Sequence, residues 1–199
     1  MTAPLYAAID CGTNSTRLLV SDGISTVERL MTVTRLGRDV DRTGVLAADS
    51  VARTLEVLAE YRGRMDHHGV RSVRVAATSA VRDARNSTDF TGPAEELLGV
   101  APEVLSGPEE AALSFLGATR DLPASGGPYL VVDIGGGSTE FAMGTTGVEA
   151  SASVQMGCVR MTEKHLHADP PLPEELTNCL AEVEFHLDGV LRDHPMMTA

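Results

Sequence analysis

The chain contains the same ten-residue pattern twice. Residues 8–17 read AIDCGTNSTR and residues 131–140 read VVDIGGGSTE, and the two segments align without a gap. In each copy an apolar segment leads to an aspartate, Asp10 or Asp133, which is followed by a turn rich in glycine and hydroxyl residues. A second apolar segment follows each turn. This repeat predicts two related domains, each beginning with a strand, a tight turn and a second strand.

The composition of the two turns favours binding of an anion. Backbone N–H groups and hydroxyls in such a turn bind phosphate oxygens, and an aspartate at the strand end can hold a cation beside them. A single turn of this type is usually only a tight hairpin, but a second copy in register favours a phosphate loop. The copies differ at one charged position, where Arg17 offers a cation and Glu140 a carboxylate. We therefore expect two unequal halves of a clamp for a metal-bound phosphate.

Composition and charge exclude several kinds of partner. The 199-residue chain has a net charge of −12, no Trp and few other aromatic residues. A negative field disfavours nucleic acid and anionic membranes, and scarce aromatics disfavour stacking on single-stranded bases. The odd number of widely spaced cysteines predicts a reducing compartment without a zinc site. With no signal peptide and no apolar run of membrane-spanning length, the expected location is the cytoplasm.

Alternating strand and helix patterns predict an α/β fold with mixed sheets flanked by helices. Strands are expected near residues 5–10, 17–21, 27–33, 73–77, 103–105 and 149–154. Helices are expected at 49–68, 106–120 and 159–166 and over the last part of the chain, and a further helix is expected to begin at 78–79. Residues 36–46 are expected to form an irregular loop. The last helix is predicted to carry Leu176, Leu180, Val183, Leu187 and Val190 on one face.

One helix start separates two neighbouring glutamates. Ser106 and Glu109 have the spacing of a capping box, and Pro108 fits the first helical turn. Glu109 is therefore expected to bond to the backbone at the helix start, which makes Glu110 the candidate for chemistry.

A Pro- and Gly-rich segment at 123–128 is the expected domain boundary. It divides the chain into a first domain, residues 1–124, and the N-terminal part of a second, residues 125–199. Because the second copy of the repeat is followed by far fewer residues than the first, the second domain is expected to be incomplete. Such a domain has an open sheet edge and uncovered apolar faces, so a homodimer is one expected outcome.

Five short motifs occur in order along nearly the whole chain. They are DCGTNSTR at 10–17, ATSAVRDARN at 77–86, SGPEEA at 106–111, DIGGGSTE at 133–140 and GCVR at 157–160. Together they resemble the exopolyphosphatase and guanosine pentaphosphate phosphohydrolase family of the actin, hexokinase and sugar-kinase fold superfamily. The resemblance implies duplicated ribonuclease H-like (actin-like ATPase) domains, and hydrolysis of a terminal phosphate from inorganic polyphosphate or guanosine pentaphosphate.

The resemblance also implies roles for particular residues. Glu110 matches the base that activates water, and Asp133 and Glu140 match acidic residues linked to catalysis and metal. Together with Asp10 these two residues are expected to hold Mg²⁺ or Mn²⁺. The expected phosphate ligands are Gly12, Thr13, Asn14, Ser15, Arg17, Arg82, Gly135, Gly136, Gly137 and Ser138.

Several residues with a possible functional role also fit a purely structural one. Arg17 and Arg82 fit ordinary surface ion pairs, and Glu110 fits a carboxylate that interacts with a helix dipole. Cys158 lacks a convincing base partner and is expected to be a packed small side chain rather than a nucleophile. His165 and His167 do not face each other on a helix, and we expect them at the surface rather than on a metal.

Three other functions remain open at this stage. Guanosine pentaphosphate hydrolysis uses the same chemistry, since both substrates present a terminal phosphoanhydride. A kinase of the same superfamily shares the paired loops but needs a nucleotide-base pocket. An incomplete second domain also fits a non-catalytic module that binds polyphosphate.

Overall fold

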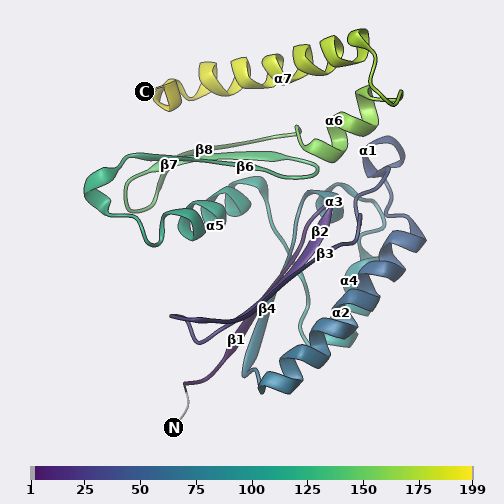
Figure 1. Ribbon diagram of the computed structural model, residues 1–199, viewed down its shortest axis with the longest axis vertical. Helices are drawn as coiled ribbons and strands as arrows, with labels where there is room; N and C mark the ends of the chain where they lie inside the picture. Colours follow the sequence, from purple (N-terminus) through teal and green to yellow (C-terminus); the bar gives the residue numbers. More distant parts are fainter. Residues whose placement is uncertain (1–2, 199) are drawn as a thin grey trace. The chain divides into compact units, whose positions relative to one another are not determined.

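The computed structural model describes residues 3–198 and divides between Leu105 and Ser106 into two compact units (Figure 1). Unit 1 ends at Leu105, and unit 2 begins at Ser106. Each unit contains one β-sheet and its own helices. The predicted α/β architecture with two sheets is thus confirmed.

Unit 1 holds a five-stranded mixed sheet in the order β3-β2-β1-β4-β5. The strands β1, β2 and β3 are antiparallel, whereas β4 runs parallel to β1 and β5 parallel to β4. The elements of unit 1 are β1 (Tyr6–Cys11), β2 (Ser15–Ser21), β3 (Thr26–Val33), α1 (Val40–Thr43), α2 (Ala48–His68), β4 (Ser72–Ala77), α3 (Ser79–Asp83), α4 (Thr88–Leu98) and β5 (Glu103–Val104). The short helices α1 and α3 and the helix α4 connect the longer elements.

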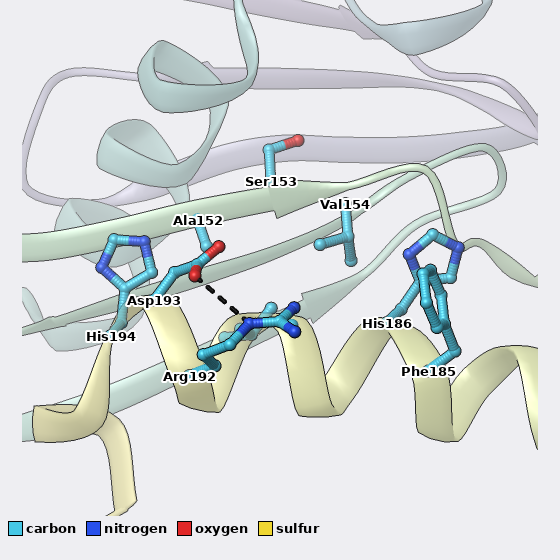
Figure 2. Close-up of a pocket in the computed structure, with 10 residues that line it drawn as sticks. Ala152, Ser153, Val154, Phe185, His186, Arg192, Asp193 and His194 are labelled. Atoms are coloured by element: carbon cyan, nitrogen blue, oxygen red, sulfur yellow. Dashed lines mark ion pairs between the residues drawn. The ribbon is translucent and has the colours of Figure 1, made fainter.

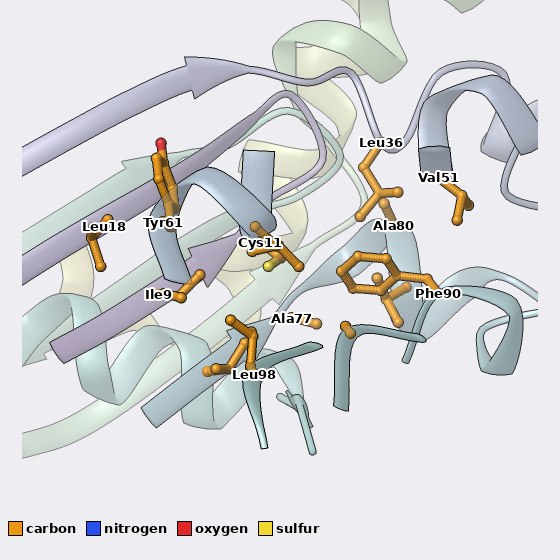
Figure 3. Close-up of a cluster of buried hydrophobic side chains, with 14 of the residues drawn as sticks. Ile9, Cys11, Leu18, Leu36, Val51, Tyr61, Ala77, Ala80, Phe90 and Leu98 are labelled. Atoms are coloured by element: carbon orange, nitrogen blue, oxygen red, sulfur yellow. The ribbon is translucent and has the colours of Figure 1, made fainter. Parts of the chain in front are cut away.

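The core of unit 1 lies between one face of the sheet and the helices α2 and α4 (Figure 3). Alternate residues of β1 and β2, such as Ile9 and Leu18, are buried against Tyr61 of α2 and Phe90 of α4. Burial of each large apolar side chain stabilises the fold by about 1.5–3 kcal/mol relative to exposure. Because side chains alternate along a strand, Asp10 belongs to the face of β1 that does not pack on this core.

Unit 2 holds an antiparallel three-stranded sheet in the order β6-β7-β8. Its elements are α5 (Gly107–Thr119), the 3₁₀ turn η1 (Ala124–Gly126), β6 (Tyr129–Ile134), β7 (Thr139–Gly144), β8 (Val148–Val154), α6 (Cys158–His165), α7 (Pro173–Asp193) and the 3₁₀ turn η2 (Pro195–Thr198). On one face of the sheet Ala142 packs against Ala111 and Phe115 of α5. On the other face Phe141 and Met143 pack against residues of α6 and α7.

Helix α5 belongs to unit 2. The division falls before α5, earlier than the predicted boundary at 124/125, because α5 packs on β6, β7 and β8. The Pro- and Gly-rich segment therefore lies inside unit 2, as the connection from α5 through η1 to β6.

The predicted apolar face of the last helix is only partly covered. Leu176 and Leu180 are 46% and 61% exposed, whereas Val190 is buried. The helix α7 packs on the sheet through Cys179, Val183 and Val190 instead. Apolar side chains on the edge strand β6 are also uncovered, since Val132 is 44% and Ile134 70% exposed.

Candidate phosphate-binding and catalytic site

The first phosphate loop joins β1 to β2 in unit 1. Asp10 stands directly opposite Arg17 across the strand pair, and their side chains form an ion pair with an N···O distance of 3.7 Å. The turn is closed by a bond of 3.0 Å from the Gly12 N–H to the Ser15 carbonyl. Both side chains of the ion pair are about half exposed, at 57% for Arg17 and 43% for Asp10.

Carbonyl groups of this loop are held by the segment after β3. The Asn14 carbonyl accepts bonds from the N–H groups of Thr34 and Arg35, at 3.1 and 3.0 Å, and the Thr13 carbonyl accepts one from Gly37 at 2.9 Å. The Thr13 hydroxyl is buried and bonds to the Ser79 hydroxyl at 2.8 Å. The structure therefore assigns this hydroxyl to the support of the loop, whereas Asn14 and Ser15 are only half buried.

Arg82 lies in α3, which follows β4. Its Nη1 donates to the Leu105 carbonyl at 2.7 Å, and its Nε lies 4.0 Å from Asp83. These contacts fix the side chain within unit 1.

The second phosphate loop, in unit 2, repeats the geometry of the first. Asp133 stands directly opposite Glu140 across β6 and β7, and the Gly135 N–H donates to the Ser138 carbonyl at 3.0 Å. Partners that are directly opposite on antiparallel strands present their side chains on the same face. The two carboxylates therefore belong to one face of the sheet, the face that also packs against α5 through Ala142.

Each carboxylate of this pair accepts a bond from a serine. Ser153 on β8 donates to Glu140 Oε1 at 2.8 Å, and Glu140 is only 2% exposed. Ser114 on α5 donates to the exposed Asp133 carboxylate. These bonds hold the two acidic side chains in defined positions.

The predicted capping box at the start of α5 is confirmed. Glu109 accepts a bond of 2.8 Å from the Ser106 N–H, and the Ser106 hydroxyl accepts one of 3.4 Å from the Glu109 N–H. Glu110 is half buried in the same first turn. It precedes Ser114 by four residues, so both belong to the face of α5 where Ser114 contacts Asp133.

Gly107 lets this helix start approach the sheet closely. A Cβ atom at Gly107 would lie 2.4 Å from the Ser153 Cβ, closer than two carbon atoms can pack. The first turn of α5 therefore lies directly over the serine that bonds Glu140. In unit 2 the structure thus places Asp133 and Glu140 on the sheet face that packs against α5, the helix whose first turn carries Glu110.

The start of α6 supports the second loop. The Cys158 N–H donates to the Gly135 carbonyl at 2.9 Å, and the N–H groups of Val159 and Arg160 donate to the Gly136 carbonyl at 2.9 and 3.1 Å. A Cβ at Gly157 would lie 2.5 Å from the Gly136 carbonyl, so this position requires glycine for close approach.

A second group of contacts was not predicted from the sequence. His165 is not a surface residue, because its side chain is 14% exposed and bonds to Glu182 of α7 at 2.7 Å. Lys164 also donates to Glu182, at 2.7 Å. Glu182 thereby links α7 to α6, the helix whose start supports the second loop.

Comparison with known proteins identifies the family. The family model described as the Ppx/GppA phosphatase family matches residues 16–196. The chain belongs to the Ppx/GppA phosphatase family. The match includes Arg17, Glu110 and the whole second loop.

Two curated relatives in this family differ in their named activities. The chain is 43% identical over 212 residues to exopolyphosphatase 2 of Mycobacterium tuberculosis, an alignment that covers 100% of this chain and 66% of the relative. It is 34% identical over 202 residues to the guanosine-5'-triphosphate,3'-diphosphate pyrophosphatase of Vibrio cholerae, covering 98% of this chain and 40% of the relative. The chain thus spans less than two thirds of both relatives.

Solved structures confirm the fold. The crystal structure of an exopolyphosphatase-like protein matches with a TM-score of 0.91 at 44% identity, covering 94% of this chain and 62% of that one. The ethanolamine utilization protein EutJ of Carboxydothermus hydrogenoformans matches with a TM-score of 0.54 at 16% identity, covering 98% and 74%. This Ppx/GppA chain therefore has the predicted actin-like α/β fold.

The carboxylates of the second loop suit the divalent cation that the family implies. Among residues 3–198 no group of three or more His, Cys, Asp or Glu side chains is arranged to hold a metal ion. Mg²⁺, however, is usually bound by only one or two carboxylates, with waters and substrate phosphates completing its shell. Asp133 and Glu140, paired across β6 and β7, fit that requirement.

A hollow of about 320 Å³ lies elsewhere in unit 2, between β8 and the C-terminal half of α7 (Figure 2). Its lining includes Ser153, Phe185 and His186, together with Arg192 and Asp193, which form an ion pair at 3.6 Å. None of the predicted site residues lines it.

In the described part of the chain, no helix is long and apolar enough to cross a membrane.

Proposed function

We propose that this Ppx/GppA family member removes terminal orthophosphate from inorganic polyphosphate. The observation that carries the proposal is the pair of carboxylates Asp133 and Glu140, which stand opposite each other across two strands, on the sheet face that packs against the helix of Glu110. The 43% identity to an exopolyphosphatase over the whole chain supports this choice of substrate.

Glu110 acts as the general base. Its carboxylate orients a water molecule and accepts a proton as the water oxygen attacks the terminal phosphorus. The bridging P–O bond breaks, and its electron pair leaves with the shortened phosphate chain. Glu109 cannot readily replace Glu110, because the capping box holds its carboxylate at the Ser106 N–H.

Asp133 and Glu140 hold Mg²⁺ or Mn²⁺ in this proposal. When bound, the cation neutralises negative charge on the phosphate oxygens. Asp10 remains the predicted metal ligand of unit 1. The net charge of −12 makes local positive groups necessary for a polyanionic substrate.

The loop residues bind phosphate oxygens. Thr13, Asn14 and Ser15 in unit 1 and Gly136, Gly137 and Ser138 in unit 2 supply backbone N–H groups, and Ser15 and Ser138 also supply hydroxyls. Gly12 and Gly135 shape the two loops, because their N–H groups close the turns. Arg17 supplies a guanidinium, for which phosphate competes with Asp10. Arg82, whose Nη1 donates to the Leu105 carbonyl, has the same proposed role.

Guanosine pentaphosphate is the second candidate substrate. The identity of 34% to the Vibrio cholerae pyrophosphatase favours it, although that alignment covers a smaller share of the relative. Both substrates present the same terminal phosphoanhydride, so the residues near the bond that breaks serve either one.

Phosphate release from purified protein tests the proposal. The chain is incubated with polyphosphate and Mg²⁺, with an EDTA control, and parallel samples contain guanosine pentaphosphate or ATP with a sugar or acetate acceptor. We expect metal-dependent release that is fastest from polyphosphate. Faster release from guanosine pentaphosphate would favour the second substrate, and transfer to the acceptor would favour a kinase. Tight polyphosphate binding without release would instead favour a non-catalytic module.

Other expectations from the sequence remain proposals. The negative charge and the scarcity of aromatic residues favour the absence of nucleic-acid and membrane partners, and the widely spaced cysteines favour a cytoplasmic location. Exposed apolar residues of β6 and α7 favour a homodimer. Sizing by light scattering at several protein concentrations checks the oligomeric state.

A further inference from the structure

The two phosphate loops hold equivalent carbonyl groups in different ways. Asn14 in unit 1 and Gly137 in unit 2 occupy the same place in the sequence repeat. The Asn14 carbonyl accepts bonds from two backbone N–H groups, those of Thr34 and Arg35. The Gly137 carbonyl instead accepts a bond of 2.7 Å from the side chain of Arg160, through Nε.

We propose that Arg160 is a positioning residue, which orients the second phosphate loop through Gly137. The proposal rests on the proposed function of this loop as a phosphate ligand. It assigns to Arg160 a role in holding the loop rather than in touching phosphate. In unit 1 the backbone after β3 performs the equivalent task.

The geometry of the peptide bond connects this contact to phosphate binding. In a trans peptide the C=O of one residue and the N–H of the next point in opposite directions, and the peptides of this loop are trans. The carbonyls of Gly135, Gly136 and Gly137 are all bonded to the start of α6. The N–H groups that follow them, those of residues 136–138, therefore point away from α6, and such successive N–H groups form an anion-binding concavity.

The guanidinium of Arg160 is itself held at a second point. Its Nη2 donates to Gln155 Oε1 at 2.7 Å, and the residue is half buried. A planar guanidinium can bridge two acceptors in a fixed geometry, which a lysine ammonium cannot reproduce. Gln155 therefore aims the Nε–H of Arg160 at the Gly137 carbonyl.

Composition explains why this loop needs an external support. Residues 135–137 are three consecutive glycines, which have the widest backbone freedom of any residue. The first loop has Thr13 and Asn14 at two of these positions, and its Thr13 hydroxyl is bonded to Ser79. A side-chain contact on Gly137 offsets the freedom of the glycine loop.

Two variants separate positioning from direct contact with phosphate. Arg160→Lys keeps the positive charge but cannot bridge Gly137 and Gln155, whereas Gln155→Met keeps Arg160 and removes its second acceptor. Arg192→Lys is a matched control, since Arg192 is 73% exposed on α7. Binding of inorganic tripolyphosphate with Mg²⁺ is measured by calorimetry at several salt concentrations. Amide hydrogen exchange of residues 136–138 is measured without ligand, after thermal melts confirm that each variant is folded.

If Arg160 positions the loop, Arg160→Lys and Gln155→Met should both weaken tripolyphosphate binding and speed exchange of the loop amides. Arg160→Lys weakens tripolyphosphate binding roughly tenfold with an unchanged salt dependence, as expected for loss of a hydrogen bond from a charged group. It also speeds exchange of the three loop amides, and Gln155→Met produces smaller changes in both measurements. Arg192→Lys leaves both at the parent values.

Retained tripolyphosphate binding and unchanged exchange in Arg160→Lys would overturn the proposal. A further variant, Arg160→Gln, removes the positive charge. If it alone weakened binding, with Arg160→Lys and Gln155→Met unchanged, the charge would matter rather than the bridge, and the proposal would also be overturned. If the parent protein does not bind tripolyphosphate, the proposed function fails. Loop exchange would still decide whether Arg160 holds the loop.

Discussion

Asp133 and Glu140 stand directly opposite each other on adjacent antiparallel strands, in the register that places Asp10 opposite Arg17 in unit 1. Directly opposed like charges destabilise a strand pair, whereas opposite charges stabilise it. In unit 1 the opposed residues have opposite charges and form an ion pair of 3.7 Å, whereas in unit 2 both opposed residues are carboxylates. This difference between two otherwise equivalent loops favours a cation in unit 2.

Mg²⁺ is expected to stabilise the protein through this pair. A ligand that binds only the folded state raises its stability, so saturating Mg²⁺ should raise the melting temperature by roughly 3–8 °C. Asp133→Asn should remove most of this increase, and without metal it should be at least as stable as the parent because the repulsion is relieved. Asp188→Asn on α7 is the control. An equal Mg²⁺ effect in Asp133→Asn would contradict the assignment.

Two glycines of α5 provide a matched test of the close approach to β8. Gly107→Ala places a Cβ 2.4 Å from Ser153, which should cost about 1–3 kcal/mol of unfolding free energy and lower phosphate release. Gly117→Ala in the same helix has no atom within 4 Å of the new Cβ and should stabilise the protein by roughly 0.5–1 kcal/mol. Chemical denaturation measures both. Similar effects of the two substitutions would argue against the close approach of α5 to β8.

Glu182 should make stability depend on pH. Its bonds, first to Lys164 and then to His165, hold the pKa of its carboxyl below the ordinary value of 4.5. Because this pKa is depressed in the folded state, the stabilisation is complete above about pH 4.5 and is lost as the pH falls through the folded-state pKa.

Glu182→Gln tests this dependence. At pH 7 the substitution should lower the unfolding free energy by roughly 1 kcal/mol, and the difference from the parent should shrink below pH 4. Glu184→Gln, at an exposed position of the same helix, should have little effect. A Glu182→Gln difference that persists unchanged at acidic pH would contradict the charged contact.

The three cysteines should differ in their reactivity. Cys158 is exposed, so the packed side chain expected from the sequence is wrong. Cys179 is half buried, whereas Cys11 is fully buried in β1. Burial, and then the neighbouring Asp10 carboxylate, raises the pKa of the Cys11 thiol far above its ordinary value. Since the thiolate is the reactive form, alkylation followed by mass spectrometry should modify Cys158 first and Cys11 only on unfolding. Equal labelling of Cys11 and Cys158 in the folded protein would contradict the structure.

Local patterns were sufficient to predict much of the fold. The repeat predicted both hairpins, and the spacing of Ser106 and Glu109 predicted the capping box, because turns and helix starts depend on neighbouring residues. The start and end of α2 were also predicted closely, since Gly69 takes a left-handed conformation that ends the helix.

Contacts between distant residues could not be predicted in the same way. The bonds of Arg160 to Gly137 and of His165 to Glu182 depend on how α6 packs on the loop and on α7. Periodicity identified an apolar stripe on α7 but not how much of that stripe the sheet covers, since Leu180 is exposed and Val190 is buried. The packing of α5 on the second sheet likewise moved the boundary between the units.

The central claim is that Glu110 is the base of a phosphohydrolase, and its neighbour Glu109 supplies the control. Glutamine retains the capping-box bond, so Glu109→Gln should release phosphate from polyphosphate at nearly the parent rate. Glu110→Gln should keep polyphosphate binding and lose at least about 100-fold in the rate of metal-dependent release, as expected for removal of a general base. Equal rates for Glu110→Gln and the parent protein, or a larger loss in Glu109→Gln, would contradict the account.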